Sequence, residues 1–489
     1  MDQQVFLGVS WGNLLTYMKR NSGMDPDMDP DMGDYYNVVL SFVYDYIPDP
    51  PSPPSPHSRS PACRGSPTAS TASAASRTSH LLPDGGARGQ LLFGGPSPRA
   101  VTAAVSRVLV AHPGPFRCVH LTRTTMDEHR GEMARWLDIL VAKGVQELVF
   151  VNRPWPLDPR LPATLFSCAS LTRLYLGIWR LPESTAVPRG ARFPNLRELG
   201  LCMIAMKDRD LALLLERSPV LEFLLIMGCQ IGVRLRLVSQ SLRCLQLSMF
   251  FLGDMDVVDA PCLERLFQYY YTYTNKNCST SRIKIGGAPN LRMLGYLEPG
   301  GQEFNLAGSK ESIVQILGIE VQFGVRSVVK KVPGFLRCFP NLETLHVQSH
   351  HISEEPTRKV NVKFWLQGGP IKCVVESMRK VFLYEFRGSR SEVTFLKFVA
   401  ERARVLEQMV VVVSTKSFSP GDDVSAKLKP LTNAKWASKA CKLELFKSPP
   451  AQCGVAPFCH RLANDFSFPD PFNVKDYCEE RIAELTVVQ

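Results

Sequence analysis

The sequence lacks the features that would place it in a membrane or a secretory pathway. It contains no stretch of about 18 or more apolar residues, so no transmembrane helix is expected. The first 20 residues have no basic stretch that leads into a long apolar run, which is not the pattern of a signal peptide. The 14 cysteines are scattered without a C-x-x-C pair, and several lie at apolar positions. We therefore expect reduced thiols and a protein of the cytoplasm, the nucleus or both.

Catalytic and metal-binding patterns are also missing. There is no G-x-S-x-G nucleophile motif and no G-x-x-x-x-G-K-[ST] phosphate-binding loop. His346, His350 and His351 lie close together, but zinc would need further ligands, so we interpret them as solvated turn histidines. Cys453, Cys459 and His460 do not have the spacing of a known zinc module. The prediction is a protein that is not an enzyme and has no metal and no cofactor.

The charge is positive but is not arranged as a nucleic-acid site. The formal net charge is +11, and a basic surface can attract nucleic acids or acidic proteins. However, no dense run of lysine and arginine with interleaved aromatic residues occurs in the chain. This favours a mildly basic surface, and a nucleic-acid-binding solenoid remains the weaker alternative.

What the sequence does contain is a short pattern, L-x-x-L-x-Φ (Φ apolar), that recurs nine times. Clear copies are FPNLRELGL, SPVLEFLLI and FPNLETLHV. Successive copies are 21 to 28 residues apart, which is the period of leucine-rich repeats. The first apolar residues of the copies are Val145, Leu171, Leu196, Leu221, Leu242, Leu263, Leu291, Val314 and Leu342.

The pattern predicts an α/β leucine-rich-repeat solenoid with parallel strands on its concave face. The second and third apolar residues of a copy are two apart, so they share one face of a strand, and only stacked neighbours can bury that face. A helix is predicted over 208–217 with Asp208 as its N-cap, and Leu199→Ala is expected to cost far more stability than Glu198→Ala. The predicted strands lie near 148–151, 173–176, 198–201, 223–226, 244–247, 265–268, 293–296, 316–319 and 344–347.

The chain divides into four predicted regions. Residues 1–80 are low in complexity, rich in Pro, Ser, Ala and Arg over their second half, and are predicted to be disordered. The repeat array covers 81–370. Residues 371–415 read as strand, helix (392–408) and strand, an α/β cap on the end of the array. Residues 416–489 form a weakly patterned, Lys-rich tail.

These residues resemble a known family. The PNL-type strands at this period look like the plant F-box/leucine-rich-repeat family, particularly its grass branch. KVFLYEFRGSRSEVTFLKFVAERARVLEQMVV resembles the C-terminal FBD module of those proteins, and WASKACKLELF and ANDFSFPDPF fit their tails. The resemblance implies a substrate receptor of an SCF-type E3 ubiquitin ligase, in which the F-box binds a Skp-type adaptor and the repeats bind a target protein.

The segment where that family carries its F-box does not match. No L-P-D followed by an apolar helix occurs in 1–80, where Trp11 is the only tryptophan. HLLPDGG at 80–86 is followed by a Gly pair rather than by leucines. We therefore predict weak or absent adaptor binding. An F-box-less leucine-rich-repeat interaction protein without a ligase role is the alternative function.

Target binding is assigned to the concave face, where side chains next to the buried leucines point outward. Exposed aromatic residues with arginine nearby are typical of protein interfaces. Tyr269 and Tyr270 begin a YYYTY run after one strand, and the alternative is that these tyrosines turn inward as core or pack on the next repeat. The candidate target-binding residues are Arg173, Tyr175, Glu198, Phe223, Gln246, Arg265, Phe267, Tyr269, Tyr270, Thr344 and His346. The target itself is not identified by the sequence.

Overall fold

The chain divides into two compact units, and strand β9 (Cys244–Phe250) has residues assigned to each. Unit 1 comprises Met1–Leu242 and Leu247–Leu252, and unit 2 comprises Arg243–Gln246 and Gly253–Gln489. The computed structural model describes residues 5–6, 9–10, 43, 46–48, 98–122, 130–152, 160–229, 234–250, 254–269, 281–299, 302–306, 313–350, 364–365, 369–414, 417–418, 423–447, 462–473 and 480–485. Most of the segment 1–80, which was predicted to be disordered, therefore lies outside the described residues. The same holds for five residues discussed above, namely Tyr270, His351, Cys453, Cys459 and His460.

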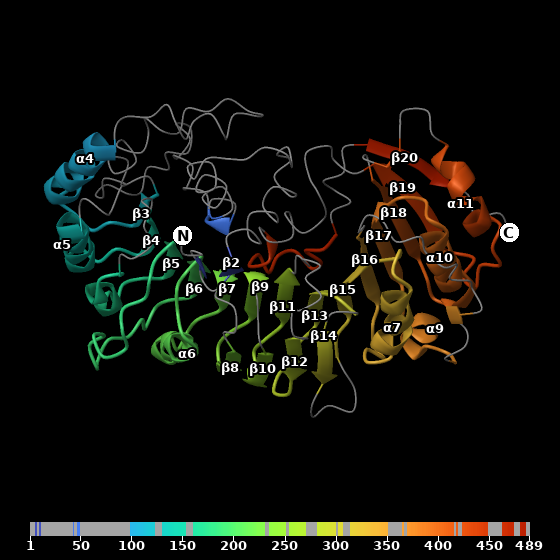
Figure 1. Ribbon diagram of the computed structural model, residues 1–489, viewed down its shortest axis with the longest axis horizontal. Coiled ribbons are helices and arrows are strands. Elements are labelled where there is room, and N and C mark those ends of the chain that lie inside the picture. Colours follow the sequence, from blue (N-terminus) through green and yellow to red (C-terminus); the bar gives the residue numbers. More distant parts are fainter. Residues whose placement is uncertain are drawn as a thin grey trace, which may run out of the picture. The chain divides into compact units, whose positions relative to one another are not determined.

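Unit 1 is built on five parallel strands that pair in chain order (Figure 1). They are β3 (Cys118–Leu121), β4 (Glu147–Val151), β5 (Arg173–Gly177), β6 (Glu198–Cys202) and β7 (Phe223–Cys229). The other elements are β1 (Val5–Phe6), β2 (Val9–Ser10), α4 (Pro98–Ala111), α5 (Arg130–Ala142), η2 (Ala163–Ser167), α6 (Asp208–Arg217) and β8 (Leu235–Val238). Helix α6 has the predicted bounds, but its N-cap is Lys207 rather than Asp208, because the Asp210 carboxylate accepts from the Lys207 amide.

Unit 2 is also built on parallel strands and ends with one antiparallel strand (Figure 1). Its main strands are β11 (Arg265–Tyr269), β13 (Met293–Leu297), β15 (Ile316–Val321), β16 (Thr344–Ser349), β17 (Lys380–Phe386), β18 (Gln408–Val413), β19 (Lys442–Lys447) and β20 (Glu480–Leu485). Three parallel return strands, β10 (Asp254–Asp259), β12 (Ser281–Ile285) and β14 (Gln302–Leu306), belong to a second sheet. The helices are α7 (Arg326–Leu336), α9 (Lys372–Glu376), α10 (Arg390–Arg402) and α11 (Val424–Thr432).

All nine predicted strands are present, and the predicted leucines form the core. In unit 1, Leu174, Leu199 and Leu224 are aligned in register on β5, β6 and β7, and all three are buried. The first leucine of each copy is also buried in the turn that precedes its strand, as at Leu171 and Leu196. This stacking confirms the α/β leucine-rich-repeat fold, in which each repeat completes the core of the next.

Different repeats return the chain to the next strand in different ways. The repeats from Leu196 to Leu221 and from Val314 to Leu342 return through helices α6 and α7. The 28-residue repeat from Leu263 to Leu291 returns through strand β12. The short 21-residue repeat from Leu242 to Leu263 has no room for a helix beside its strand and uses β10 instead. Side chains of β10 alternate between buried and partly exposed, as expected of a strand with one covered face.

The segment predicted to cap the array adds further strands to the same sheet in unit 2. β17 pairs in parallel with β16, and β18 pairs in parallel with β17. The predicted helix 392–408 ends at Arg402, and Leu406 is the buried first residue of another repeat whose strand begins at Gln408. The residues predicted to form a weakly patterned tail contain α11, β19 and β20.

A buried carboxylate organises the start of α10. Ser389 is the N-cap, and its hydroxyl accepts from the Glu392 amide at 3.2 Å while the Glu392 carboxylate accepts from the Ser389 amide at 2.7 Å. Glu392 also accepts a 2.6 Å hydrogen bond from the Ser349 hydroxyl at the end of β16. The Arg387 guanidinium donates to the Ser349 carbonyl at 2.9 Å. One capping box therefore joins the helix to the preceding repeat.

Candidate target-binding face

In unit 1 the outward side chains of β5 and β6 form one hydrogen-bonded cluster. The Arg173 guanidinium donates to the Glu198 carboxylate at 2.6 Å and to the Glu147 carboxylate at 3.3 Å. The Tyr175 hydroxyl donates to the other Glu198 oxygen at 2.6 Å. Three of the sequence-predicted residues, from two neighbouring repeats, are therefore brought together. The Arg173 side chain is 38% exposed, which leaves part of its charge accessible.

Small residues shape the rest of this face. The Tyr175 ring lies over Gly200 of β6, where any Cβ would overlap the ring. Burial, and then the Glu198 carboxylate, raise the pKa of Tyr175, so its hydroxyl stays protonated and can act as a donor. Phe223 follows Glu198 in the register and is buried rather than exposed.

Residues from the N-terminal region contact the same face of unit 1. Val43 is fully buried, and its side chain approaches Gly177 at the end of β5 closely enough to meet any Cβ placed there. The Tyr46 hydroxyl lies 2.5 Å from the Ser248 hydroxyl, 202 positions along the chain. The sequence did not indicate these contacts, because Val43 belongs to a short apolar patch outside the repeat pattern.

In unit 2 the predicted residue Arg265 holds a polypeptide segment. Its guanidinium donates to the main-chain carbonyls of Ala463 at 3.1 Å, Asp465 at 3.0 Å and Phe468 at 2.6 Å. Arg265 is only 4% exposed, and burial lowers its pKa. A buried guanidinium needs hydrogen-bond acceptors, and these three carbonyls supply them.

A second set of outward side chains contacts the end of the same segment. The His346 ring lies 3.0 Å through Nε2 from the Asp470 carboxylate and 3.0 Å through Nδ1 from the Tyr384 hydroxyl. Tyr384 in turn donates to the Phe472 carbonyl at 2.9 Å. His346 is fully buried, so its interpretation as a solvated turn residue is wrong. Its position on β16 follows from the repeat register, but its burial depends on a segment 124 positions away.

The remaining candidates in unit 2 lie on β9, β11 and β16. Phe267 contacts Phe472 edge-on with 5.1 Å between ring centroids, and Thr344 is buried at the start of β16. Gln246 is 1% exposed, and its amide has no hydrogen-bond partner among the described residues. Tyr269 ends β11. The structure therefore groups Arg265, Phe267 and His346 around one segment, and target binding by these residues stays a prediction.

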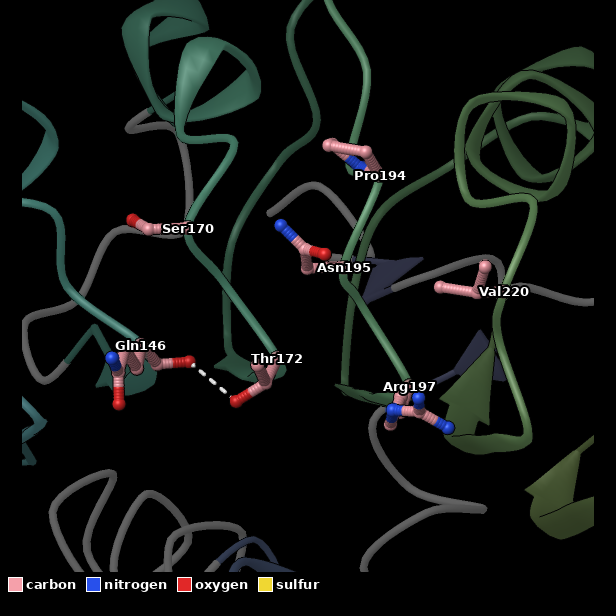
Figure 2. A pocket seen from close by; sticks show the side chains of 7 residues that line it. All are labelled: Gln146, Ser170, Thr172, Pro194, Asn195, Arg197 and Val220. Atoms are coloured by element: carbon pink, nitrogen blue, oxygen red, sulfur yellow. Dashed lines mark hydrogen bonds between the residues drawn. The ribbon is translucent and has the colours of Figure 1, made fainter.

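A surface pocket of about 370 Å³ lies elsewhere in unit 1, at the turns that precede the strands (Figure 2). Its polar side chains are used for stacking repeats. The Ser170 hydroxyl donates to the Val145 carbonyl at 2.8 Å, the Thr172 hydroxyl to Gln146 at 3.1 Å, and the Asn195 amide to Ala169 at 2.9 Å. The pocket is lined by Gln146, Ser170, Thr172, Pro194, Asn195, Arg197 and Val220.

The Asn or Ser before the first leucine has the same role in other repeats. The Asn290 amide donates to the Pro261 carbonyl at 2.8 Å, and the Ser241 hydroxyl donates to the Leu221 carbonyl at 2.9 Å. These side chains donate to turn carbonyls of the preceding repeat. The recurrence of Asn or Ser at this position was visible in the sequence, but its bonding role was not.

Two buried carboxylates lie near the ends of β13 and β15. Burial raises the pKa of Glu298 to about 7, with Lys331 opposing the shift. Burial, and then the nearby Glu298, raise the pKa of Glu320 to about 8. Within the described ranges no group of three His, Cys, Asp or Glu residues could hold a metal ion. No helix among the described residues is long and apolar enough to cross a bilayer.

Comparison with known families agrees with this architecture. Residues 133–347 match the family described as the LRR repeats of FBD-associated F-box protein At5g56370. Residues 367–411 match the FBD family and contain α9, β17, α10 and the start of β18. A search of curated proteins found no match to the chain.

Proposed function

We propose that this chain, whose repeats and FBD segment are similar to those of FBD-associated F-box proteins, binds a target protein through its concave strands, as the substrate receptor of an SCF-type ubiquitin ligase does. Leucine-rich repeats and an FBD segment indicate a role in protein interaction. The finer proposal is that the outward side chains of the parallel strands contact the target. The chain then acts by binding and not by catalysis.

One observation carries this proposal. The outward side chains of unit 2 hold a stretch of polypeptide through main-chain hydrogen bonds from Arg265, a polar contact from His346 and an aromatic contact from Phe267. A face that can desolvate and satisfy a polypeptide backbone has the chemistry that protein recognition requires. Unit 1 presents an outward cluster of the same kind, centred on the partly exposed Arg173.

The unit 1 cluster supplies the test of target binding. The full chain, its Arg173→Glu variant and an Arg192→Glu control are each fused to a proximity-labelling enzyme in cells. Arg192 is an exposed residue in the connection before β6, so its variant makes the same charge change away from the face. We expect a set of proteins that Arg173→Glu loses and Arg192→Glu retains. Identical sets for both variants would contradict target binding by this face.

The ligase role is tested separately with a purified Skp-type adaptor. Binding at sub-micromolar strength by the full chain, lost on removal of residues 1–80, supports a working receptor and would reveal an F-box that the sequence pattern does not show. The absence of an L-P-D helix pattern from 1–80 favours the second candidate, an interaction protein without a ligase role. Retention of target binding without adaptor binding is the result expected of that candidate.

A further inference from the structure

A twelve-residue segment of the C-terminal region, Leu462–Asn473, lies across outward side chains of unit 2. We call it the strap. Figure 1 shows it in red beside β11 and β13, on the side opposite to β12 and β14. The strap belongs to the connection between β19, which ends at Lys447, and β20, which begins at Glu480. Because β19 and β20 pair directly, the strap can leave the face without unpairing either strand.

The first half of the strap is held mainly by its main chain. Three of its carbonyls accept from the Arg265 guanidinium. The Phe466 ring lies under two cations, with its centroid 3.8 Å from the Arg243 guanidinium carbon and 4.6 Å from that of Arg265. Main-chain recognition and one stacked ring would accept many sequences that have an aromatic residue at this position.

The second half is a turn whose side chains are recognised individually. The Asp470 carboxylate accepts from the Phe472 amide at 3.2 Å, and the Asp470 carbonyl accepts from the Asn473 amide at 3.1 Å. The turn directs the other Asp470 oxygen to His346 and the Phe472 ring into the face. That ring lies 5.1 Å from Phe267, 5.0 Å from Tyr296 and 5.5 Å from His346, measured between centroids.

The side chains between these two halves do not contribute to the contact. Ser467, Phe468 and Pro469 are exposed, although the Phe468 carbonyl is bonded to Arg265. The face therefore reads three features of a polypeptide: main-chain carbonyls, one aromatic ring over two arginines, and an Asp-Pro-Phe turn. None of these features requires that the polypeptide belong to the same chain.

We propose that the outward side chains of Arg265, Phe267, Tyr296, His346 and Tyr384 form a groove for a target segment that contains an Asp-Pro-Phe turn, and that the strap occupies this groove until such a segment displaces it. The proposal rests on the proposed function, since it names the kind of target segment that the concave strands bind. The strap buries Arg265 and His346 and supplies their hydrogen-bond partners, so a target segment that displaces it must supply equivalent partners. A tethered strap competes at an effective concentration near the millimolar range, so a target must bind more tightly than the free strap sequence.

The test is an exchange experiment on the full chain. A fluorescent peptide of residues 461–475 is titrated into the wild type and into Asp470→Ala, Phe472→Ala and Phe468→Ala variants. We expect at least tenfold tighter peptide binding by the Asp470→Ala and Phe472→Ala chains, because their own straps compete poorly. The matched control Phe468→Ala removes an exposed ring from the same strap and should behave as the wild type. A peptide that itself carries Phe472→Ala should not bind.

Other results would overturn the proposal. Folded Asp470→Ala and Phe472→Ala chains that bind no better than the wild type would make the strap a permanent part of the structure. Unfolding of both variants would lead to the same conclusion, although Asp470 is 17% exposed and its loss should be tolerated. If the Phe472→Ala peptide bound as tightly as the unaltered peptide, the binding would be nonspecific and would not depend on the Asp-Pro-Phe turn. Arg173→Glu lies in unit 1, so failure of the target-binding test there and failure of strap exchange are separate results.

Discussion

The imidazole of His346 lies 3.0 Å from the carboxylate of Asp470, although the two residues are 124 positions apart. His346 stands on a repeat strand, whereas Asp470 stands in a segment with no repeat pattern. This contact turns a side chain expected at an open surface into a fully buried one. The strap thus already covers Arg265 and His346 in unit 2, so a target that binds these side chains must displace it.

Leucines inside the sheet should dominate the stability of unit 1. Leu199→Ala or Leu224→Ala is expected to cost about 2–5 kcal/mol, because each removes a fully buried side chain. Glu198→Ala was expected from the sequence to cost little, but the structure changes that expectation to about 1–3 kcal/mol, since it leaves the buried Tyr175 hydroxyl without its acceptor. Chemical denaturation measures these values. A loss as large at the exposed control Arg192→Ala would contradict the assignment of faces.

Gly200 should tolerate no side chain. Gly200→Ala places a Cβ into the Tyr175 ring, which must move and release Glu198, so we expect a loss of about 1–3 kcal/mol. Gly190→Ala is the matched control, because nothing lies within 4 Å of its added Cβ, and it should change stability by less than about 0.5 kcal/mol. The two melting curves give the comparison. Equal melting of both variants would mean that Tyr175 is not held against β6.

The buried Glu392 should be essential to the FBD segment. Glu392→Ala removes the acceptor of the Ser349 hydroxyl and of the Ser389 amide, and we expect a loss of about 2–4 kcal/mol. Glu401→Ala, on the same helix, breaks only a partly exposed pair with Lys397 and should cost under about 1 kcal/mol. Thermal unfolding of the full chain checks the difference. Similar losses at both positions would refute the capping role of Glu392.

The stability of unit 2 should depend on pH through Glu298 and Glu320. Their pKa values are raised to about 7 and about 8, so the folded state retains protons that the unfolded chain releases near pH 4.3 (about the ordinary pKa of Glu). Their contribution to stability is complete below about pH 4.3 and falls as the pH rises towards 8. Urea unfolding between pH 5 and 8.5 should show this decline in the wild type.

Glu320→Gln separates this effect from the titration of other groups. The variant imitates the protonated form and should flatten the decline, while Glu407→Gln changes a half-exposed carboxylate and should leave it intact. A wild-type slope that persists in Glu320→Gln would mean that Glu320 ionises in the folded protein as it does in solution.

The sequence predicted the strands well and their environment poorly. The spacing of Leu171, Leu196 and Leu221 predicted the first residues of β5, β6 and β7 correctly, because side-chain alternation along a strand is a local property. The return strand β10 was not predicted, since its pattern extends over only six residues. Leu406 was assigned to a helix face because the apolar spacing of its neighbours fits a helix as well as a strand. In the structure Leu406 instead precedes strand β18, which pairs with β17.

The candidate site likewise has one part that the sequence predicted and one part that it did not. The register by itself brings Arg173, Tyr175 and Glu198 together, since equivalent positions of neighbouring repeats lie side by side in parallel strands. The sequence therefore determined the repeat, its core and which side chains share the concave face. Only the tertiary structure decided that Arg265 and His346 are buried, because their partners come from the strap. Contacts between segments so far apart in the chain leave no periodic pattern, and they form only when the sheet on which they rest has already been assembled.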